Sequence, residues 1–275
     1  MLKRKADLHI HTTMSDGTDT VEEIMSLARH RGIDTIAITD HDTTAALENL
    51  ERPDDMTVID GIELSTWHEG TSVHVLGYFI DINNKVLKST LSNLKNERRE
   101  RGVKILEKLD QIEGIHIDPD TILKKSTQAS IGRMDIAREL VRMGIIKKPG
   151  QAFERFIGDG MPCYVSTRKI STAEAVRLIE GANGIPVLAH PGTIDGFTDY
   201  EALLDLGFKG IEVFYPKHTR EQRQFFHDLA VKRNILVAGG SDFHGSRTPG
   251  RNKIGQAYLS ENYMTRIFEY INERK

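Results

Sequence analysis

Two histidines one residue apart near the start of the chain could bind a metal ion. They are His9 and His11 in the segment ADLHIHTTMSD at residues 6–16. Side chains alternate along a strand, so a strand here would point both imidazoles to one face and the neighbouring apolar side chains to the other. Together with Asp16, the imidazole face could hold a cation, although such a pair also occurs as two hydrogen-bonded surface histidines.

Further histidines and carboxylates follow the later predicted strands. The segment DTIAITDHD is a near-continuous apolar run that ends on Asp40 and His41, as expected of a buried parallel strand. A barrel of parallel strands brings their carboxyl ends to one face. Nine imidazoles and carboxylates there exceed the three or four ligands that one ion takes from protein, which indicates two or three zinc, manganese or iron ions sharing a carboxylate. The expected ligands are His9, His11, Asp16, His41, Glu63, His74, His190, Asp242 and His244.

The composition is typical of one large globular domain or of a domain with an insertion. The chain has 275 residues, of which 39% are hydrophobic. No apolar run approaches the roughly 20 residues of a membrane span, and the first residues lead into a strand without the apolar segment of a signal peptide. We therefore expect a cytoplasmic protein. Cys163 is the single cysteine, which excludes an internal disulfide and a C-x-x-C motif.

Strands alternate with helices at both ends of the chain, and helices alone fill the middle. This pattern predicts an α/β fold in which residues 1–84 and 165–275 form one parallel barrel that carries the metal site, with residues 85–164 as a helical insertion. Between Lys85 and Arg168 there are 17 basic and 11 acidic residues, against 20 basic and 29 acidic residues elsewhere. A basic insertion suits an anionic substrate such as a phosphate ester, although the excess could simply coat exposed helices.

Seven segments together resemble the PHP (polymerase and histidinol phosphatase) phosphoesterases in chain order and spacing. They are DLHIHTTMSDGT, ITDHDT, GIEL, HVLGY, VLAHPG, GIEVFYPKHT and GGSDFHG, and they extend over nearly the whole chain. The chain is most similar to the subgroup with a helical insertion, which contains nucleotide 3′,5′-bisphosphate phosphatases and 5′ to 3′ exoribonucleases of short RNAs. The resemblance implies a distorted (β/α)7 PHP barrel, three divalent metal ions and an insertion that caps the site and recognises substrate.

The resemblance also implies the division of the ligands and the mechanism. We expect manganese ions, with iron or zinc as alternatives. A hydroxide bridging the first two metals would attack phosphorus, while the third metal would take charge from the phosphoryl oxygens or the leaving group. By motif, His9, His11, Glu63 and Asp242 would hold the first metal, Asp16, His41 and His244 the second, and Glu63, His74 and His190 the third.

One segment of the insertion, SIGRMDIA, resembles a family segment that contacts a substrate phosphate. The resemblance assigns this contact to Ser130 and Arg133, and a guanidinium can bind such an anion bidentately. Met134 and Asp135 stand where many relatives have Pro-His, which alters the expected contact to the base or second phosphate. The remaining candidates are Arg168 and Lys217 for substrate binding, and Asp40 and His218 for catalysis, where Asp40 could orient His41 or shuttle a proton.

The resulting expectation is a metal-dependent phosphoesterase that converts a 3′,5′-bisphosphonucleotide to a nucleoside 5′-monophosphate, with short 5′-phosphorylated RNA as an extension. The basic insertion favours a substrate with a second anionic group. The alternatives are a nucleoside monophosphate or histidinol-phosphate phosphatase and, from another class, a non-catalytic PHP module that serves stability or subunit contact. The expected partner is a phosphorylated nucleotide or a short oligoribonucleotide, with neither a membrane nor an obligate protein partner.

Overall fold

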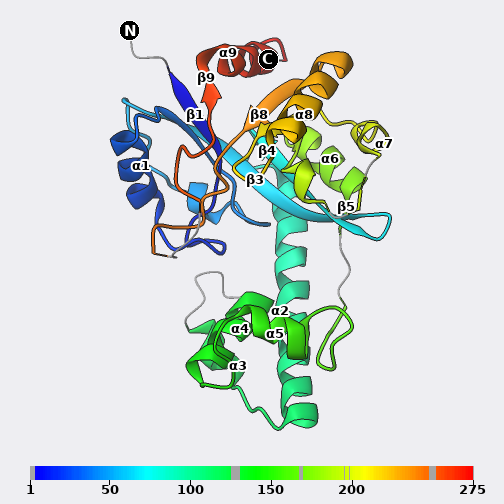
Figure 1. Ribbon diagram of the computed structural model, residues 1–275. Helices are drawn as coiled ribbons and strands as arrows, with labels where there is room; N and C mark the ends of the chain where they lie inside the picture. Colours follow the sequence, from blue (N-terminus) through cyan, green and yellow to red (C-terminus); the bar gives the residue numbers. More distant parts are fainter. Residues whose placement is uncertain are drawn as a thin grey trace. The chain divides into compact units, whose positions relative to one another are not determined.

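The computed structural model describes residues 4–124, 131–166, 170–194, 196–197, 199–247 and 252–274. The chain divides into two compact units, one formed by Met1–Lys88 and Lys169–Lys275 and the other by Ser89–Arg168 (Figure 1). The first unit is a mixed α/β body with a nearly closed, barrel-shaped sheet, as expected for the PHP barrel. The second unit contains helices inserted between two halves of the first.

The barrel sheet is built from short, apolar strands. Its strand order is β8-β7-β6-β4-β3-β2-β1-β9, and β5 pairs with β3 off this path. The strands β2 and β6, TIAI and IPVL, are buried at every position, as expected of strands covered on both faces. The strand bounds are β1 Lys5–Ile10, β2 Thr35–Ile38, β3 Thr57–His68, β4 Thr71–Tyr78, β5 Ile170–Ser171, β6 Ile185–Leu188, β7 Gly210–Phe214, β8 Leu236–Gly239 and β9 Leu259–Ser260.

Two strands of the sheet run antiparallel to their neighbours, namely β4, and β9, which pairs with β1. Strand β4 pairs antiparallel with both β3 and β6, whereas β1, β2 and β3 pair in parallel, as do β6, β7 and β8. The physical reason is a tight turn at Glu69 and Gly70, whose φ values of 45° and 87° suit a two-residue hairpin. The expectation of an entirely parallel sheet is therefore wrong at β4 and at β9. Because β4 is reversed, its beginning lies beside the carboxyl ends of its neighbours, and His74 near that beginning still reaches the same end of the barrel.

The barrel closes between β1 and the segment that follows β8. The main-chain N–H of His11 donates to the carbonyl of Phe243 at 2.9 Å, and Ile10 forms a parallel bridge with Phe243. Gly240 permits this close approach, because a Cβ atom at that position would lie 2.4 Å from the main-chain nitrogen of His9. The closure brings the ends of β1 and β8 together.

Helices with well-formed amino-terminal caps connect the strands. Thr20 and Glu23 form a capping box at the start of α1, and Ser171 and Glu174 form one at the start of α6. On α1, Val21, Ile24, Met25 and Ala28 are buried. The helices of this unit are α1 Val21–His30, α6 Thr172–Gly181, α7 Tyr200–Leu204, α8 Arg220–Arg233 and α9 Glu261–Asn272, with short 3₁₀ turns at Ala45–Leu47 and Pro191–Thr193.

The insertion has a hydrophobic core of its own. Gly102 lies against Ile131 so closely that a Cβ atom would approach the Ile131 side chain to 2.4 Å. Buried side chains from its helices, among them Ile105, Leu109 and Phe156, form one cluster. The helical elements here are α2 Lys85–Glu113, which begins in the barrel unit, α3 Pro119–Leu123, α4 Arg133–Arg142, α5 Gly150–Ala152 and the π-helical turn Phe153–Ile157.

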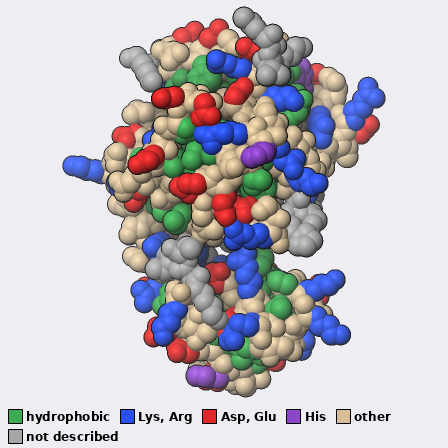
Figure 2. All heavy atoms as spheres, turned by 90° about the vertical axis from the view of Figure 1, so that its left-hand side faces the viewer, with side chains coloured by type: hydrophobic (Ala, Val, Ile, Leu, Met, Phe, Trp, Pro, Cys, Tyr) green, Lys and Arg blue, Asp and Glu red, His purple; other side chains and the backbone are tan. Residues whose placement is uncertain are grey.

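Basic side chains are spread over the insertion. Lys and Arg occur at several places on the face of this unit that Figure 2 shows.

Among the described residues, no helix combines the length and the apolar character that crossing a membrane requires.

Candidate metal centre

Glu63 on β3 lies at the centre of the expected ligand set. Its side chain is fully buried, and its two carboxylate oxygens face different histidines. The Oε1 atom lies 2.8 Å from His74 Nδ1 and 3.1 Å from His190 Nε2. The Oε2 atom lies 3.2 Å from each of His9 Nε2, His11 Nε2 and His41 Nδ1.

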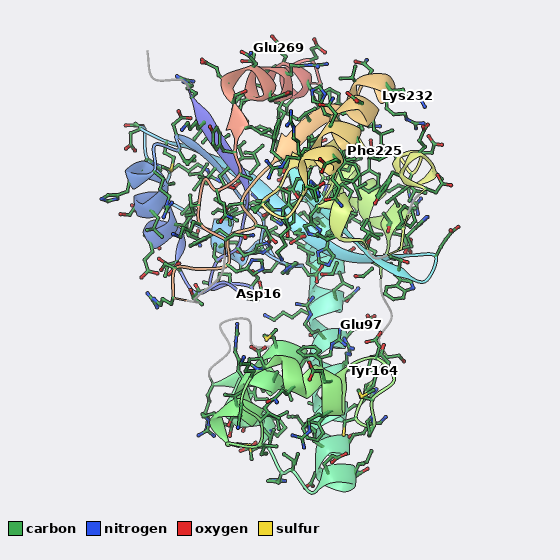
Figure 3. All side chains as sticks on the ribbon, viewed as in Figure 1. Asp16, Glu97, Tyr164, Phe225, Lys232 and Glu269 are labelled. Atoms are coloured by element: carbon green, nitrogen blue, oxygen red, sulfur yellow. The ribbon has the colours of Figure 1, made fainter. Side chains whose placement is uncertain are left out.

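Two aspartates and His244 extend this cluster beside His11. The Asp242 Oδ1 atom lies 3.3 Å from His11 Nε2, 3.3 Å from His244 Nδ1 and 3.6 Å from His9 Nε2. Asp16, on the loop after β1 (Figure 3), places its Oδ1 atom 3.2 Å from His244 Nε2. All nine residues expected as ligands therefore lie in one continuous cluster.

Three subsets of these residues are spaced closely enough to hold an ion. In each subset the ligand atoms lie within 4.8 Å of one another. These subsets differ in part from the assignment implied by the family resemblance. His11 is also grouped with Asp16, and His41 is also grouped with His74. The subsets are His9, His11 and Glu63; His11, Asp16, His41 and His244; and His41, Glu63 and His74.

Several buried polar atoms of this cluster have no hydrogen-bond partner within the described part of the chain. They include His9 Nε2, both ring nitrogens of His11, His41 Nδ1 and Glu63 Oε2. Several such atoms in one place are costly for a fold unless a further group satisfies them. Lone pairs of imidazole and carboxylate that converge on the same space suit a divalent cation. The residues present therefore fit a metal centre.

The charges of the cluster also suit a metal centre. Burial alone would raise the pKa of Glu63, but His41 and His9 outweigh it and hold this pKa well below its usual range. Burial opposes protonation of His11, yet the nearby carboxylates of Asp242 and Glu63 raise its pKa to about 10. Burial instead lowers the pKa of His41 to about 4. The carboxylates thus remain ionised, and a cation would displace protons from histidines such as His11.

Unusual backbone conformations aim several of these side chains. His190 has a φ of 25° and Asp242 has a φ of 51°, both in the left-handed region that favours glycine. Asp42, next to His41, lies in the same region with a φ of 53°. Asp42 accepts the main-chain N–H of Ser65 at 2.9 Å. Such strain is typical of functional sites, where the surrounding structure holds it in place.

Two residues of β7 and its end support the cluster, and the sequence analysis did not identify them. Glu212 is fully buried and lies 3.1 Å from His9 Nδ1, while the Tyr215 hydroxyl donates to Asp242 Oδ2 at 2.9 Å. A glutamate inside the otherwise apolar run GIEVF was the available signal, because a buried carboxylate needs hydrogen-bond partners.

Asp40 shapes the loop after β1. Its carboxylate accepts the main-chain N–H and the hydroxyl of Thr12, both at 2.7 Å, and the hydroxyl of Ser15. Burial raises its pKa. These bonds hold the loop that carries Asp16, and they support a positioning role for Asp40.

His218 is buried, and main-chain groups occupy both of its ring nitrogens. Its Nδ1 atom lies 3.0 Å from the carbonyl of Val213, and its Nε2 atom accepts the N–H of Gly192 at 3.1 Å. This bonding leaves no ring nitrogen for a substrate, so the geometry does not support the catalytic role expected for His218. The side chain instead joins the loops that follow β6 and β7. The neighbouring Lys217 is exposed.

Of the candidate substrate contacts in and beside the insertion, Ser130 and Arg168 lie outside the described residues. Arg133 is the first residue of α4, and its Nη1 atom lies 3.0 Å from Asp159 Oδ1. Its guanidinium also lies 5.5 Å from the ring of Phe153.

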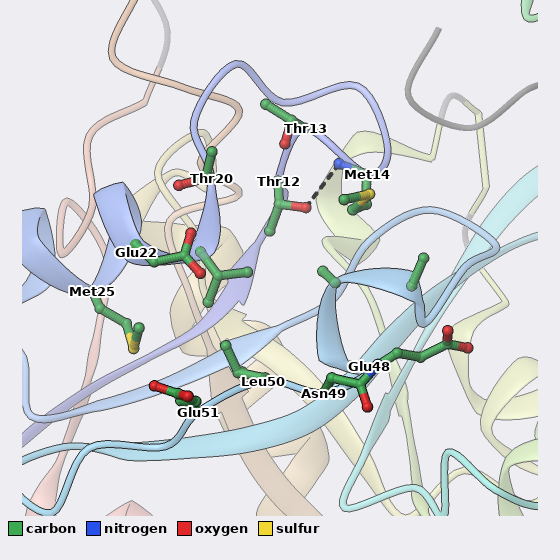
Figure 4. A pocket seen from close by; sticks show the side chains of 13 residues that line it. Thr12, Thr13, Met14, Thr20, Glu22, Met25, Glu48, Asn49, Leu50 and Glu51 are labelled. Atoms are coloured by element: carbon green, nitrogen blue, oxygen red, sulfur yellow. Dashed lines mark hydrogen bonds between the residues drawn. The ribbon is translucent and has the colours of Figure 1, made fainter.

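A pocket of about 560 Å³ is lined in part by the loop after β1. Figure 4 shows the Thr12 hydroxyl accepting the main-chain N–H of Met14 at 2.9 Å in its wall. Glu22, Glu48 and Glu51 also line it. Their negative charge disfavours a phosphate, so an anionic substrate fits the histidine cluster better than this pocket.

Comparisons with known proteins identify the family. Residues 7–107 match the model of the PHP domain. A 5′-3′ exoribonuclease of Haemophilus influenzae is 31% identical over 88% of this chain and 91% of its own length. A 3′,5′-nucleoside bisphosphate phosphatase of Chromobacterium violaceum is 32% identical over 90% of this chain and 89% of its own. A phosphoribosyl 1,2-cyclic phosphate 1,2-diphosphodiesterase of Eggerthella lenta is 29% identical over 87% of this chain and 94% of its own length.

A solved structure agrees over almost the whole chain. It is that of a candidate metal-dependent phosphoesterase of Bifidobacterium adolescentis, with a TM-score of 0.82 and 31% identity over 96% of this chain and 95% of the other. The chain is therefore a phosphoesterase that belongs to the PHP family of metal-dependent enzymes.

Proposed function

We propose that this enzyme hydrolyses the 3′-phosphate of a 3′,5′-bisphosphonucleotide, with short 5′-phosphorylated RNA as a related substrate, at a centre of three divalent ions such as manganese. The observation that carries the proposal is the position of Glu63. Its two oxygens face two separate sets of histidines, which suits one carboxylate shared between ions. The cytoplasmic location expected from the sequence stays a prediction.

The chain supplies the ligands and their orientation. We assign the first ion to His9, His11, Glu63 and Asp242, the second to Asp16, His41 and His244, and the third to Glu63, His74 and His190. Bound ions would lower the pKa of water and neutralise charge on the phosphoryl group. Tyr215 holds Asp242 through its hydroxyl, and Asp40 holds the loop that carries Asp16. Their part is to keep the ligand atoms convergent.

Two arginines of the insertion support a second anionic group on the substrate. The Arg101 Nε atom donates to the carbonyl of Val165 at 2.8 Å, but its buried Nη2 atom has no hydrogen-bond partner among the described residues. Burial and the charge of Arg133 lower the pKa of Arg101. Asp159 is the carboxylate paired with Arg133, and its side chain is 62% exposed. The positive charges of Arg101 and Arg133 repel each other. A bound phosphate could relieve this repulsion better than one exposed carboxylate.

A comparison of substrates tests the proposal. We would measure kcat/KM for adenosine 3′,5′-bisphosphate, AMP and histidinol phosphate in the wild type, in Arg133→Ala and in Arg138→Ala. Arg138 lies on the same helix and serves as the matched control. We expect the bisphosphate to be preferred and Arg133→Ala to cost about 2–3 kcal/mol on it, roughly 30- to 160-fold, because a charge-assisted contact is lost.

Two results would refute this assignment. One is a wild-type preference for histidinol phosphate, and the other is an equal loss on all three substrates in Arg133→Ala. The phosphoribosyl cyclic phosphate cleaved by the Eggerthella lenta relative belongs in the same comparison, because a preference for it would move the proposal to a cyclic diester.

A further inference from the structure

Glu212 on β7 is a fully buried carboxylate that lies outside the three ligand subsets. Its Oε1 atom lies 3.1 Å from His9 Nδ1, and its Oε2 atom accepts the main-chain N–H of His190 at 2.7 Å. These histidines face different oxygens of Glu63. We propose that Glu212 is a positioning residue that joins the His9 side and the His190 side of the metal centre. This inference rests on the proposed function, because it concerns the same centre.

On one side, Glu212 determines which ring nitrogen of His9 faces the metal centre. A carboxylate accepts hydrogen bonds, so the contact at 3.1 Å requires the proton of the ring to sit on Nδ1. The lone pair is then on Nε2, the atom that lies 3.2 Å from Glu63 Oε2 and 3.6 Å from Asp242 Oδ1. A carboxylate behind a metal-binding histidine also fixes the plane of the ring.

On the other side, Glu212 holds a strained main chain. His190 has a φ of 25° and a ψ of 56°, which a residue with a side chain adopts only when its surroundings enforce it. The bond from its N–H to Glu212 anchors this conformation. The ring then points its Nε2 atom at Glu63 Oε1, 3.1 Å away, while its Nδ1 atom lies 3.0 Å from the Thr193 hydroxyl.

Only a carboxylate can make both contacts. The two groups that face Glu212, the ring Nδ1–H of His9 and the main-chain N–H of His190, are both donors. Glutamine has the same shape but one acceptor oxygen and one NH₂ group. In either orientation of its amide, the NH₂ group faces one of the two N–H donors and cannot accept its hydrogen bond. Glu212→Gln should therefore disturb at least one histidine without creating a cavity.

The test measures metal binding and does not depend on turnover. Metal-free wild type, Glu212→Gln and the control Glu180→Gln would be titrated with Mn²⁺ by calorimetry, and the melting temperature recorded with and without Mn²⁺. Glu180 is a partly exposed glutamate of α6 that pairs with Lys209. We expect Glu212→Gln to raise at least one Mn²⁺ dissociation constant roughly 10- to 100-fold and to melt close to wild type without metal, and Glu180→Gln to bind as wild type.

Unchanged dissociation constants in Glu212→Gln would overturn the inference and leave the proposed function standing. A wild type that binds no Mn²⁺ would refute the proposed centre itself. A measurement on the wild type covers the case in which Glu212→Gln does not fold. In Zn²⁺-loaded protein with ¹⁵N-labelled histidine, the NMR spectrum should show His9 protonated at Nδ1 and bound through Nε2, and binding through Nδ1 would overturn the inference.

Discussion

Replacing Glu63 by glutamine should disrupt the metal centre more than any other change of equal size. Glutamine fills the same volume, but its amide group has one acceptor oxygen where the carboxylate has two. The NH₂ group must then face either His74 and His190 on the Oε1 side or the three histidines on the Oε2 side. At least one ion therefore loses a ligand, and every ion loses the attraction of one negative charge.

The size of the effect follows from the linkage between binding and stability. An ion present at 100 times its dissociation constant stabilises the folded state by about 2.7 kcal/mol. In a domain of roughly 150–250 residues, 1 kcal/mol shifts the melting temperature by about 2–4 °C. Losing one ion should therefore lower the melting temperature of the Mn²⁺-loaded protein by roughly 5–11 °C.

Differential scanning calorimetry with and without Mn²⁺ measures this difference. The rise on adding Mn²⁺ is compared within each protein, because replacing Glu63 also removes its charge interactions with the histidines from the metal-free form. Glu180→Gln serves as the control again and should keep the full rise on adding Mn²⁺. If Glu63→Gln gained as much stability from Mn²⁺ as the wild type does, the carboxylate could not be shared between ions and the reasoning would be refuted.

Two further predictions concern residues of the same face. Asp242→Asn and His244→Ala should each abolish hydrolysis while the metal-free proteins melt near wild type; a phosphate-release assay that found wild-type turnover in either would refute their assignment as ligands. His218→Phe should lose about 1–3 kcal/mol of unfolding free energy in urea, because the N–H of Gly192 and the carbonyl of Val213 lose their partner, and should keep most of its turnover. A loss of kcat above roughly 100-fold with unchanged stability would instead return His218 to catalysis.

The clustering of the histidines and carboxylates could be predicted from the sequence because these residues follow simple periodic rules. His9 and His11 are two residues apart and so share a face. His41 and Asp242 are each the third residue after an apolar strand, and the carboxyl ends of these strands must meet in a barrel. The direction of β4 was harder to predict. His74 reaches the cluster from the beginning of a strand that the turn at Glu69 and Gly70 reverses. The pairing of this strand with β6, by contrast, joins residues more than 100 positions apart along the chain.

Roles that depend on long-range hydrogen bonds could not be predicted. His218 lies within a motif that resembles the family, but one of its main-chain partners, Val213, lies in β7 and the other, Gly192, in the turn after β6. Glu212 acts through His9, which is 203 residues away. Neither contact leaves a periodic pattern, because each joins one side chain to a position fixed by the folding of the whole barrel.

Stepwise restoration of the metal tests the central claim most directly. The protein would be stripped with a chelator, and phosphate release from adenosine 3′,5′-bisphosphate would be measured as Mn²⁺ is added in known equivalents. We predict no turnover in the metal-free protein and full turnover only when the third equivalent is bound. Full activity without metal would contradict a metal-dependent reaction, and saturation after one equivalent would contradict a centre of three ions.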